Sequence, residues 1–191
     1  MAKVLPEIDK ELADWIAAQP LFFNATAPLS EDGHINVSPR GLDTFRVLGP
    51  HEVAYLDFTG SGNESAAHIA ENGRITLMFC AFSGPPRILR LYGKGEVVMP
   101  EGNDWNDLRG CFPADLPPAR QIVRVKVERV QTSCGYGVPL MKFESQRQLL
   151  LDWAEKKGPD GLAAYQSKKN SISIDGLKAP GIEAEENAAD E

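Results

Sequence analysis

Residues 52–82 read EVAYLDFTGSGNESAAHIAENGRITLMFCAF, and the elements of the rest of the chain can be placed relative to this segment. Glu52–Phe58 and Arg74–Phe82 are runs of apolar, β-branched and aromatic residues with the length of strands. Residues 62–72 between them have the pattern of a helix. The segment therefore predicts a strand, a helix and a second strand.

The two ends of the expected helix carry recognisable signals. Ser61 and Glu64 have the spacing of a capping box, in which each side chain satisfies a backbone donor at the helix start, and Gly73 supplies the stop. Glycines and unpaired N–H groups at such a helix start can also hold an anion such as phosphate. The local pattern by itself favours the simpler interpretation, a capped helix that follows a strand.

Further strands are expected on both sides of this segment. Upstream, residues 21–26 and 34–38 alternate around a polar turn, which is typical of a hairpin. Downstream, residues 87–99 form a long strand whose two internal glycines mark a bend, a bulge or the close approach of another backbone. Residues 121–130 alternate between apolar and charged side chains, which predicts an antiparallel strand with one solvated face.

Helices are expected at both ends of the chain. Residues 7–18 carry the apolar stripe of a short amphipathic helix, and Pro20 ends it. Residues 144–157 and 159–168 predict two more helices. Strands in hairpins, one helix between strands and helices at both ends favour an antiparallel β-barrel with α decoration, of the α+β class.

The chain has 191 residues, a length that favours one domain with extensions. Its 42% apolar and 25% charged residues are ordinary for a globular protein that buries a core. The expected segments are an N-terminal helix (1–20), a barrel domain (21–133), a C-terminal helical extension (134–180) and an acidic flexible tail (181–191).

Charge and hydropathy exclude several classes of function. With 20 basic and 27 acidic residues the net charge is -7, the wrong sign for a protein that binds nucleic acid by neutralising phosphates. The longest strongly apolar stretch, Ile75–Phe82, is far shorter than the roughly 20 residues of a membrane span. The N-terminus lacks the pattern of a secretory signal, so a cytoplasmic location is expected.

The residues that most often carry catalysis form no known motif here. The three cysteines have no close pair, so no metal site is expected. No nucleophile elbow or zinc-protease pattern accompanies the three histidines, which are His34, His51 and His68. Arginines are better candidates for ligand binding, because the planar guanidinium suits a phosphate. Arg40 ends a strand, and Arg87 and Arg90 lie on a later one, although each by itself is more typical of a surface.

The order of motifs resembles the FMN-binding split-barrel family related to pyridoxamine 5′-phosphate oxidase. The similarity covers roughly Phe22–Ser133. Its most telling blocks are NVSPRG at 36–41, YLDFTGSGNES at 55–65, GRITLMF at 73–79 and PPRILRLYGKG at 85–95. CGYGVP at 134–139 and SIDGL at 173–177 look like marks of an uncharacterised subgroup.

This resemblance implies a six-stranded antiparallel split barrel with helices at both ends. It also implies a homodimer in which FMN occupies clefts at the subunit interface, so that the domain at 21–133 binds the flavin. No catalytic residue follows from it. The cofactor-binding residues that it implies are Ser38, Pro39, Arg40, Phe58, Thr59, Asn63, Ser65, Arg87 and Arg90.

Two departures from the family pattern bear on function. Glu64 and Ser65 stand where the oxidases carry a basic pair, and a carboxylate repels a phosphate unless it points away. As the capping-box partner of Ser61, Glu64 would turn back toward the backbone, and arginines would supply the positive charge. Residues 181–191 also lack the Trp- and Arg-rich segment that grips pyridoxamine phosphate, so a true vitamin B6 oxidase is not expected.

The resulting hypothesis is an FMN-dependent oxidoreductase that acts on an unidentified small molecule. In it, Tyr136 and Lys142 can close over the flavin ring, or they are ordinary loop residues. One alternative keeps the fold and changes the ligand to deazaflavin F420 or haem, for which His34 or His68 would be the axial ligand. The other is a flavin-binding dimer without turnover of its own.

Overall fold

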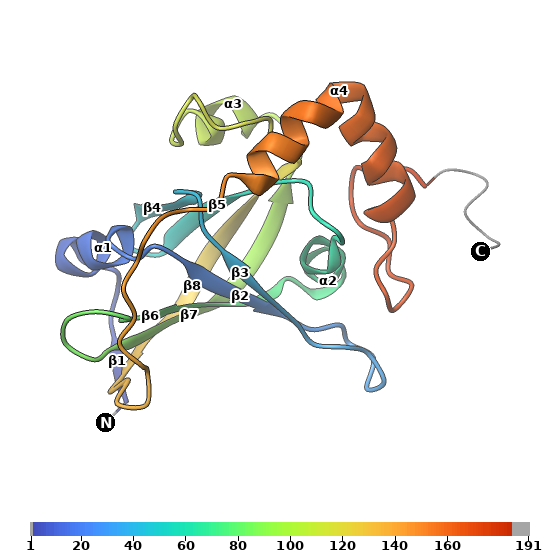
Figure 1. Cartoon of the computed structure of the whole chain (residues 1–191). Helices are drawn as coiled ribbons and strands as arrows, with labels where there is room; N and C mark the ends of the chain where they lie inside the picture. Colours follow the sequence, from blue (N-terminus) through green and yellow to red (C-terminus); the bar gives the residue numbers. More distant parts are fainter. Residues whose placement is uncertain (1, 185–191) are drawn as a thin grey trace.

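The computed structural model describes residues 2–184 (Figure 1). Of the expected tail, residues 185–191 lie outside the described part, and the segment boundaries given above stay a prediction. The elements in chain order are β1 (Lys3–Leu5), α1 (Lys10–Ala17), β2 (Phe22–Thr26), β3 (Asn36–Arg40), β4 (Phe45–Gly49), β5 (Glu52–Asp57), α2 (Glu64–Asn72), β6 (Arg74–Cys80), β7 (Ile88–Val98), α3 (Trp105–Arg109), β8 (Gln121–Ser133) and α4 (Leu149–Lys169).

The strands form one curled antiparallel sheet in the order β3-β2-β6-β7-β8-β5-β4, and β1 also pairs with β8 (Figure 1). All six strands that the sequence predicts are present, and the expected β-barrel with α decoration is confirmed. The sheet has eight strands rather than six because it includes two further short strands. β1 pairs with β8, and β4 pairs with β5. β4 follows a tight turn in which Leu42 and Asp43 have positive φ angles.

The predicted irregularity in the long strand is a bulge in the pairing of β7 with β8. The register shifts between Tyr92 and Gly93. A Cβ atom at Gly93 would overlap the backbone carbonyl of Lys126, so only glycine fits there. The bulge bends the two longest strands and helps to curl the sheet.

The core lies on both sides of the sheet. On the inner side, buried apolar residues from five strands, β2, β5, β6, β7 and β8, pack with Leu12 and Ile16 of α1. On the other side of β5 and β8, a second cluster, which includes Leu108 of α3 and Phe112, packs beneath α3. β5 is therefore buried on both faces, which explains why Val53–Leu56 reads as a continuous apolar run.

The predicted capping box at the start of α2 is wrong. The N-cap residue is Asn63, and its side chain makes no capping hydrogen bond. The helix begins at Glu64, one residue after the cap, whereas a capping box needs its acid three residues after the cap. The Glu64 carboxylate instead accepts the backbone N–H of Ile174 at 3.1 Å. Gly73, by contrast, ends the helix in the left-handed conformation, as predicted.

The predicted C-terminal helices form one kinked element. Gly158 has φ 67° and ψ 172°, which separates the two helical parts of α4 at the boundary that Pro159 also marks. The expected start at residue 144 is wrong, because α4 begins at Leu149. Before it, the side-chain amide of Gln146 donates to the carbonyl of Pro20, which ties this non-helical segment to the chain just before β2. Within residues 2–184, no helix is long and apolar enough to span a membrane.

Candidate functional site

A cleft of about 440 Å³ opens between β3, the loop before α2 and the first turn of α2. β3 and α2 are far apart in sequence, but β2 brings them together, because it pairs with β3 and packs against α2. β3 and α2 therefore lie on opposite sides of the cleft. The residues that line the cleft are Asn36, Ser38, Pro39, Arg40, Phe58, Gly60, Ser61, Gly62, Asn63, Glu64, Ser65, Arg120 and Ile174.

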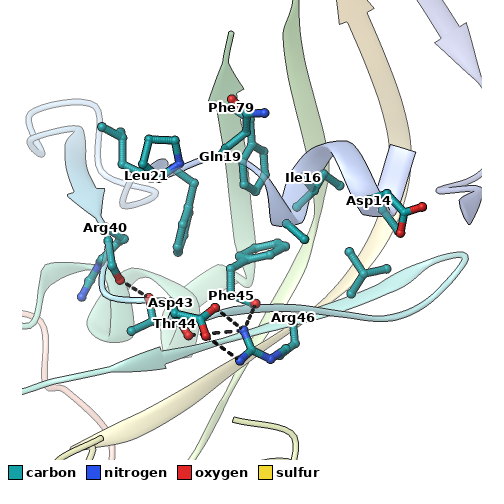
Figure 2. A pocket seen from close by; sticks show the side chains of 16 residues that line it. Asp14, Ile16, Gln19, Leu21, Arg40, Asp43, Thr44, Phe45, Arg46 and Phe79 are labelled. Atoms are coloured by element: carbon teal, nitrogen blue, oxygen red, sulfur yellow. Dashed lines mark hydrogen bonds and ion pairs between the residues drawn. The ribbon is translucent and has the colours of Figure 1, made fainter. Parts of the chain in front are cut away.

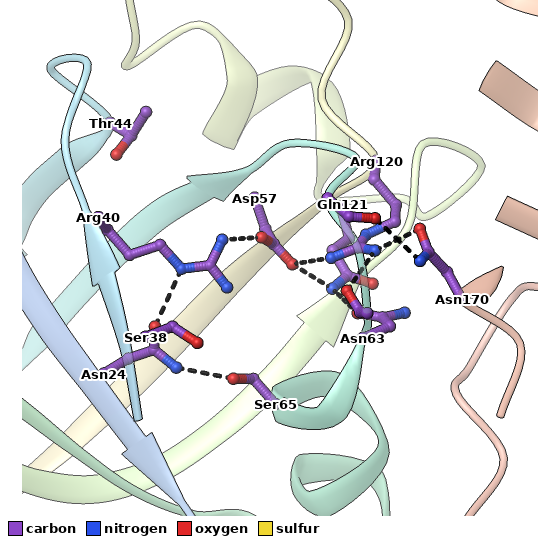
Figure 3. A network of polar contacts seen from close by, with 12 residues as sticks. Asn24, Ser38, Arg40, Thr44, Asp57, Asn63, Ser65, Arg120, Gln121 and Asn170 are labelled. Atoms are coloured by element: carbon purple, nitrogen blue, oxygen red, sulfur yellow. Dashed lines mark hydrogen bonds and ion pairs between the residues drawn. The ribbon is translucent and has the colours of Figure 1, made fainter. Parts of the chain in front are cut away.

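An ion-pair network lies at the base of the cleft (Figure 3). Asp57, the last residue of β5, has one carboxylate oxygen paired with Arg40 and the other paired with Arg120 at 2.9 Å. The Asp57 and Arg120 side chains are 1% and 2% exposed, and Arg40 keeps 20% of its side chain exposed. Two guanidinium groups therefore share a single carboxylate.

The charge of Asp57 depends on these two arginines. Burial by itself raises the pKa of this carboxyl, but the charges of Arg40 and Arg120 outweigh it and hold the pKa at about 2. The Arg40 guanidinium also lies 5.5 Å from the centre of the Tyr55 ring, which gives it a cation–π contact. Asp57 is therefore ionised at neutral pH.

The same network fixes the loop that precedes α2. The guanidinium of Arg120 donates to the carbonyl of Gly62 at 3.1 Å and to the side-chain oxygen of Asn170 at 2.6 Å. Asn170 in turn donates to the carbonyl of Gly60 at 3.1 Å. The Gln121 amide donates to Asp57 at 2.5 Å and to Asn63 at 2.8 Å. Side chains of Arg120, Asn170 and Gln121 thus fix the loop before α2 by hydrogen bonds.

The opposite side of the cleft is built from short polar side chains. The hydroxyl of Ser65 accepts from the amides of Asn24 at 2.7 Å and Asn36 at 2.9 Å, which joins α2 to β2 and β3. Asn24 also accepts from the Nε of Arg40 at 2.9 Å. Because Asn24 and Ser38 are paired across β2 and β3, they occupy the same level of the sheet.

Three polar atoms of the network are buried without a partner among the described residues. They are the Nδ2 of Asn63, the Nε of Arg120 and the Oε1 of Gln121. Two of these are donors, and both Asn63 and Arg120 line the cleft. Unpaired buried donors are costly, so the cleft has spare hydrogen-bonding capacity for an acceptor.

The structure brings six of the nine predicted cofactor-binding residues into this cleft, namely Ser38, Pro39, Arg40, Phe58, Asn63 and Ser65. Thr59 is buried behind the cleft, where its hydroxyl accepts from Gln166 at 2.7 Å. Arg87 lies over the ring of Trp15, and Arg90 donates to Ser133. These two arginines do not line the cleft within one chain.

Sequence reasoning missed Asp57, Arg120, Gln121 and Asn170, which hold the cleft together. Asp57 carried a signal, because a charged residue inside a buried apolar strand needs a partner. The partners themselves are far away in sequence, and only the folded chain shows which arginines they are. Asn170 carried no such signal.

A second cavity of about 370 Å³ lies on the other side of Arg40, between α1, β4 and the start of β2 (Figure 2). Phe45 and Phe79 line it and pack edge to face with ring centres 5.0 Å apart. Arg40 therefore separates a polar cleft from a cavity with aromatic walls.

Within the described part of the chain, none of His34, His51 and His68 lines the polar cleft. His68 is buried in α2, where its Nδ1 lies 3.0 Å from the hydroxyl of Thr26. His34 is exposed and pairs with Asp175 at 2.7 Å. Among residues 2–184, no group of three potential ligands is arranged to hold a metal ion.

Comparison with known proteins gives a consistent result. The sequence model of the family described as pyridoxamine 5′-phosphate oxidase matches residues 8–134. The pyridoxamine 5′-phosphate oxidase family protein ustO of Aspergillus flavus is 40% identical over 196 aligned residues, which cover 92% of this chain and 76% of that protein.

Solved structures agree on the fold. HupZ from Group A Streptococcus is similar with a TM-score of 0.54 at 22% identity, over 64% of this chain and 91% of that chain. A candidate pyridoxamine 5′-phosphate oxidase from Lactobacillus delbrueckii has a TM-score of 0.51 at 20% identity, over 67% of this chain and 98% of that chain. The expected split-barrel fold is thereby confirmed.

Proposed function

Because the chain belongs to the pyridoxamine 5′-phosphate oxidase family, we propose that its polar cleft binds the phosphate end of a flavin, and that the flavin is FMN. The observation that carries this proposal is the charge balance of the network. Within this network, Arg40 and Arg120 share the single carboxylate of Asp57, so the network itself carries one net positive charge. A buried charge without a counter-ion is costly, and a phosphate would supply the counter-ion.

The residues of the cleft fit such a group in three further ways. The spare donors of Asn63 and Arg120 can bond to phosphate oxygens. The positive end of the α2 dipole faces the same space. Glu64 also lines the cleft, where the N–H of Ile174 holds its carboxylate, and Arg40, Arg120 and the helix dipole must outweigh its repulsion of a phosphate.

Each element has a distinct task in this proposal. Arg40 and Arg120 bind the phosphate from a network that is formed in advance, so little ordering is needed on binding. Ser38 and Asn36 offer polar contacts from β3, and Phe58 offers an apolar surface. Bound FMN would supply hydride or electron transfer, and the protein would bind it, orient it and shield it from water.

We further propose that the protein is an oxidoreductase acting on a small molecule. The support is family membership. The expected cytoplasmic location belongs to the same proposal.

A homodimer with the cofactor at its interface is also part of the proposal. Strand β3, which lines the cleft, is one edge of the sheet, and exposed edges are prone to pair. Ile35 and Val37 at this edge are 73% and 60% exposed. Tyr136, Leu140 and Phe143 in the segment before α4 are exposed as well. Large apolar side chains in such numbers indicate a surface that a partner covers.

The first experiment is the visible spectrum of the purified protein before and after addition of FMN, with mass analysis of whatever denaturation releases. The proposal predicts a flavin spectrum and FMN as the released ligand. Release of F420 or haem would contradict the FMN assignment. Failure to bind supplied FMN would contradict the proposed function as a whole. Bound flavin that no candidate substrate reoxidises faster than oxygen alone would favour a flavin carrier.

A further inference from the structure

The segment that follows α4 forms a tight turn at one end of the cleft. Ser173 and Leu177 pair through the Ser173 N–H and the Leu177 carbonyl at 2.8 Å, and Gly176 adopts a φ of 77°. The side chain of Ser173 also accepts the N–H of Leu177 at 3.0 Å. This turn contains the SIDGL motif, and its internal bonds give it a defined shape. In Figure 1 it lies beside α2 and below α4.

The turn is anchored on both sides of the cleft. On the α2 side, the N–H of Ile174 donates to Glu64 at 3.1 Å. On the hairpin side, Asp175 accepts the backbone N–H of His34 at 2.8 Å and faces the Nδ1 of His34 at 2.7 Å. The contact raises the pKa of His34 and lowers that of Asp175, as expected for an ion pair. The turn therefore bridges from α2 to the loop between β2 and β3.

The end of α4, from which the turn leaves, is also bonded to the barrel domain. Asn170 is fully buried and joins the end of α4 to Arg120 and to Gly60. One helical turn earlier, Gln166 donates to Thr59 at 2.7 Å. The C-terminal extension thus contacts the polar cleft twice. Asn170 bonds to Arg120 at the base of the cleft, and the turn with Ile174 lies across one end of it.

The residues at the crossing have a consequence for ligand size. Ile174 lines the cleft although 71% of it is exposed, so its side chain stands beside the open end. Glu64 lies next to it at the first position of α2 and carries a negative charge. FMN ends in a single phosphate, whereas FAD continues from that position with a second phosphate and an adenosine. A longer ligand meets an apolar side chain and a carboxylate of like charge where it would leave the cleft.

We propose that residues 173–176 are a specificity-determining strap across the end of the cleft, which admits a flavin with one terminal phosphate and excludes a dinucleotide. This inference rests on the proposed function, because it places the phosphate at the start of α2. The strap acts by two means. Ile174 blocks the path beyond the first phosphate, and Glu64 repels the second.

The test compares the binding of FMN and FAD to the flavin-free full-length protein by calorimetry. The wild-type protein is expected to prefer FMN by at least about tenfold, which corresponds to about 1.4 kcal/mol. Ile174→Gly and Glu64→Gln should each tighten FAD binding by about threefold to tenfold more than they tighten FMN binding, so that the preference for FMN narrows. Asp175→Asn, which weakens the anchor to His34, should act in the same direction.

A matched control separates the strap from general effects of surface charge. Asp104 is exposed, pairs with Arg124 at 2.8 Å and does not line the cleft, so Asp104→Asn should leave the preference unchanged. Circular dichroism and thermal unfolding of each variant verify that it is folded. Because Ile174 and Glu64 are partly or largely exposed, these substitutions leave the core intact.

The outcomes distinguish this inference from the function on which it rests. Equal affinity of the wild-type protein for FMN and FAD overturns the strap and leaves the flavin site standing. An unchanged preference in both folded variants, Ile174→Gly and Glu64→Gln, also overturns the strap. Absence of binding of either flavin to the wild-type protein overturns the proposed function, and the strap with it.

Discussion

Asp57 is the residue on which the architecture of the cleft depends. It ends β5, is fully buried, and is the shared partner of Arg40 and Arg120. Removing its charge would leave two buried or half-buried guanidinium groups without a counter-ion. The loop that Arg120 and Asn63 hold would lose its support at the same time.

Asp57→Asn is therefore expected to destabilise the protein by about 3–5 kcal/mol, the usual cost of breaking a buried ion pair. Urea unfolding at pH 7 measures this loss. Asp104→Asn removes an exposed carboxylate that pairs with Arg124 and should cost at most about 1 kcal/mol. Equal effects of the two substitutions would show that the Asp57 network does not stabilise the fold.

The lowered pKa of Asp57 predicts a dependence of stability on acid. Its pKa falls from 3.8 to about 2 on folding, so its contribution is present above pH 4 and is lost as the pH falls toward 2. The expected loss is of the order of 2 kcal/mol beyond that of the Asp57→Asn variant. The measurement is the free energy of unfolding of both proteins between pH 2 and 6. Parallel curves would contradict the prediction.

At the residue scale, the sequence predicted cleft residues that lie in local motifs and missed those that act through contacts distant in sequence. Ser38, Arg40 and Asn63 lie in local motifs that resemble a known family, so they could be named without a structure. Arg120 and Asn170 act through contacts with Asp57 and Gly60 that span 50 or more positions of the chain. No local pattern encodes such contacts.

At the scale of elements, strands were easier to predict than helix ends. Alternation and apolar runs located every strand of five or more residues except β4, which is short and half-buried throughout. The errors at the starts of α2 and α4 share one feature. Near each start the chain bonds to a segment far away in sequence, Glu64 to Ile174 and Gln146 to Pro20, and no local pattern shows such contacts.

The bulge in β7 gives a prediction at this scale. Gly93→Ala is expected to destabilise the protein by about 1–3 kcal/mol, because the added methyl group would overlap the carbonyl of Lys126 and force the strands apart. Gly49→Ala is the matched control. It lies at the end of another strand, and an added Cβ would meet no atom within 4 Å. Thermal unfolding of both variants measures the difference, and a smaller effect at Gly93 would contradict the account.

For the whole molecule, the proposed homodimer predicts the mass in solution. Light scattering coupled to size-exclusion chromatography should give twice the chain mass of 20.9 kDa. Val37→Lys at the exposed edge should shift the mass toward that of one chain, because a charged side chain at an interface core opposes association. Lys157→Glu, on exposed α4, is a control that should leave the dimer intact. A monomeric wild-type protein would contradict this part of the proposal.

The central claim is that the cleft binds a flavin through its phosphate, and comparing FMN with riboflavin tests it most directly. Riboflavin carries the same ring and lacks the phosphate, so calorimetric titration isolates the contribution of the charged cleft. We predict that FMN binds at least about tenfold more tightly than riboflavin, since charge-assisted hydrogen bonds to one phosphate are worth about 1.5–3 kcal/mol or more. Equal affinities, or no binding of FMN, would contradict the account.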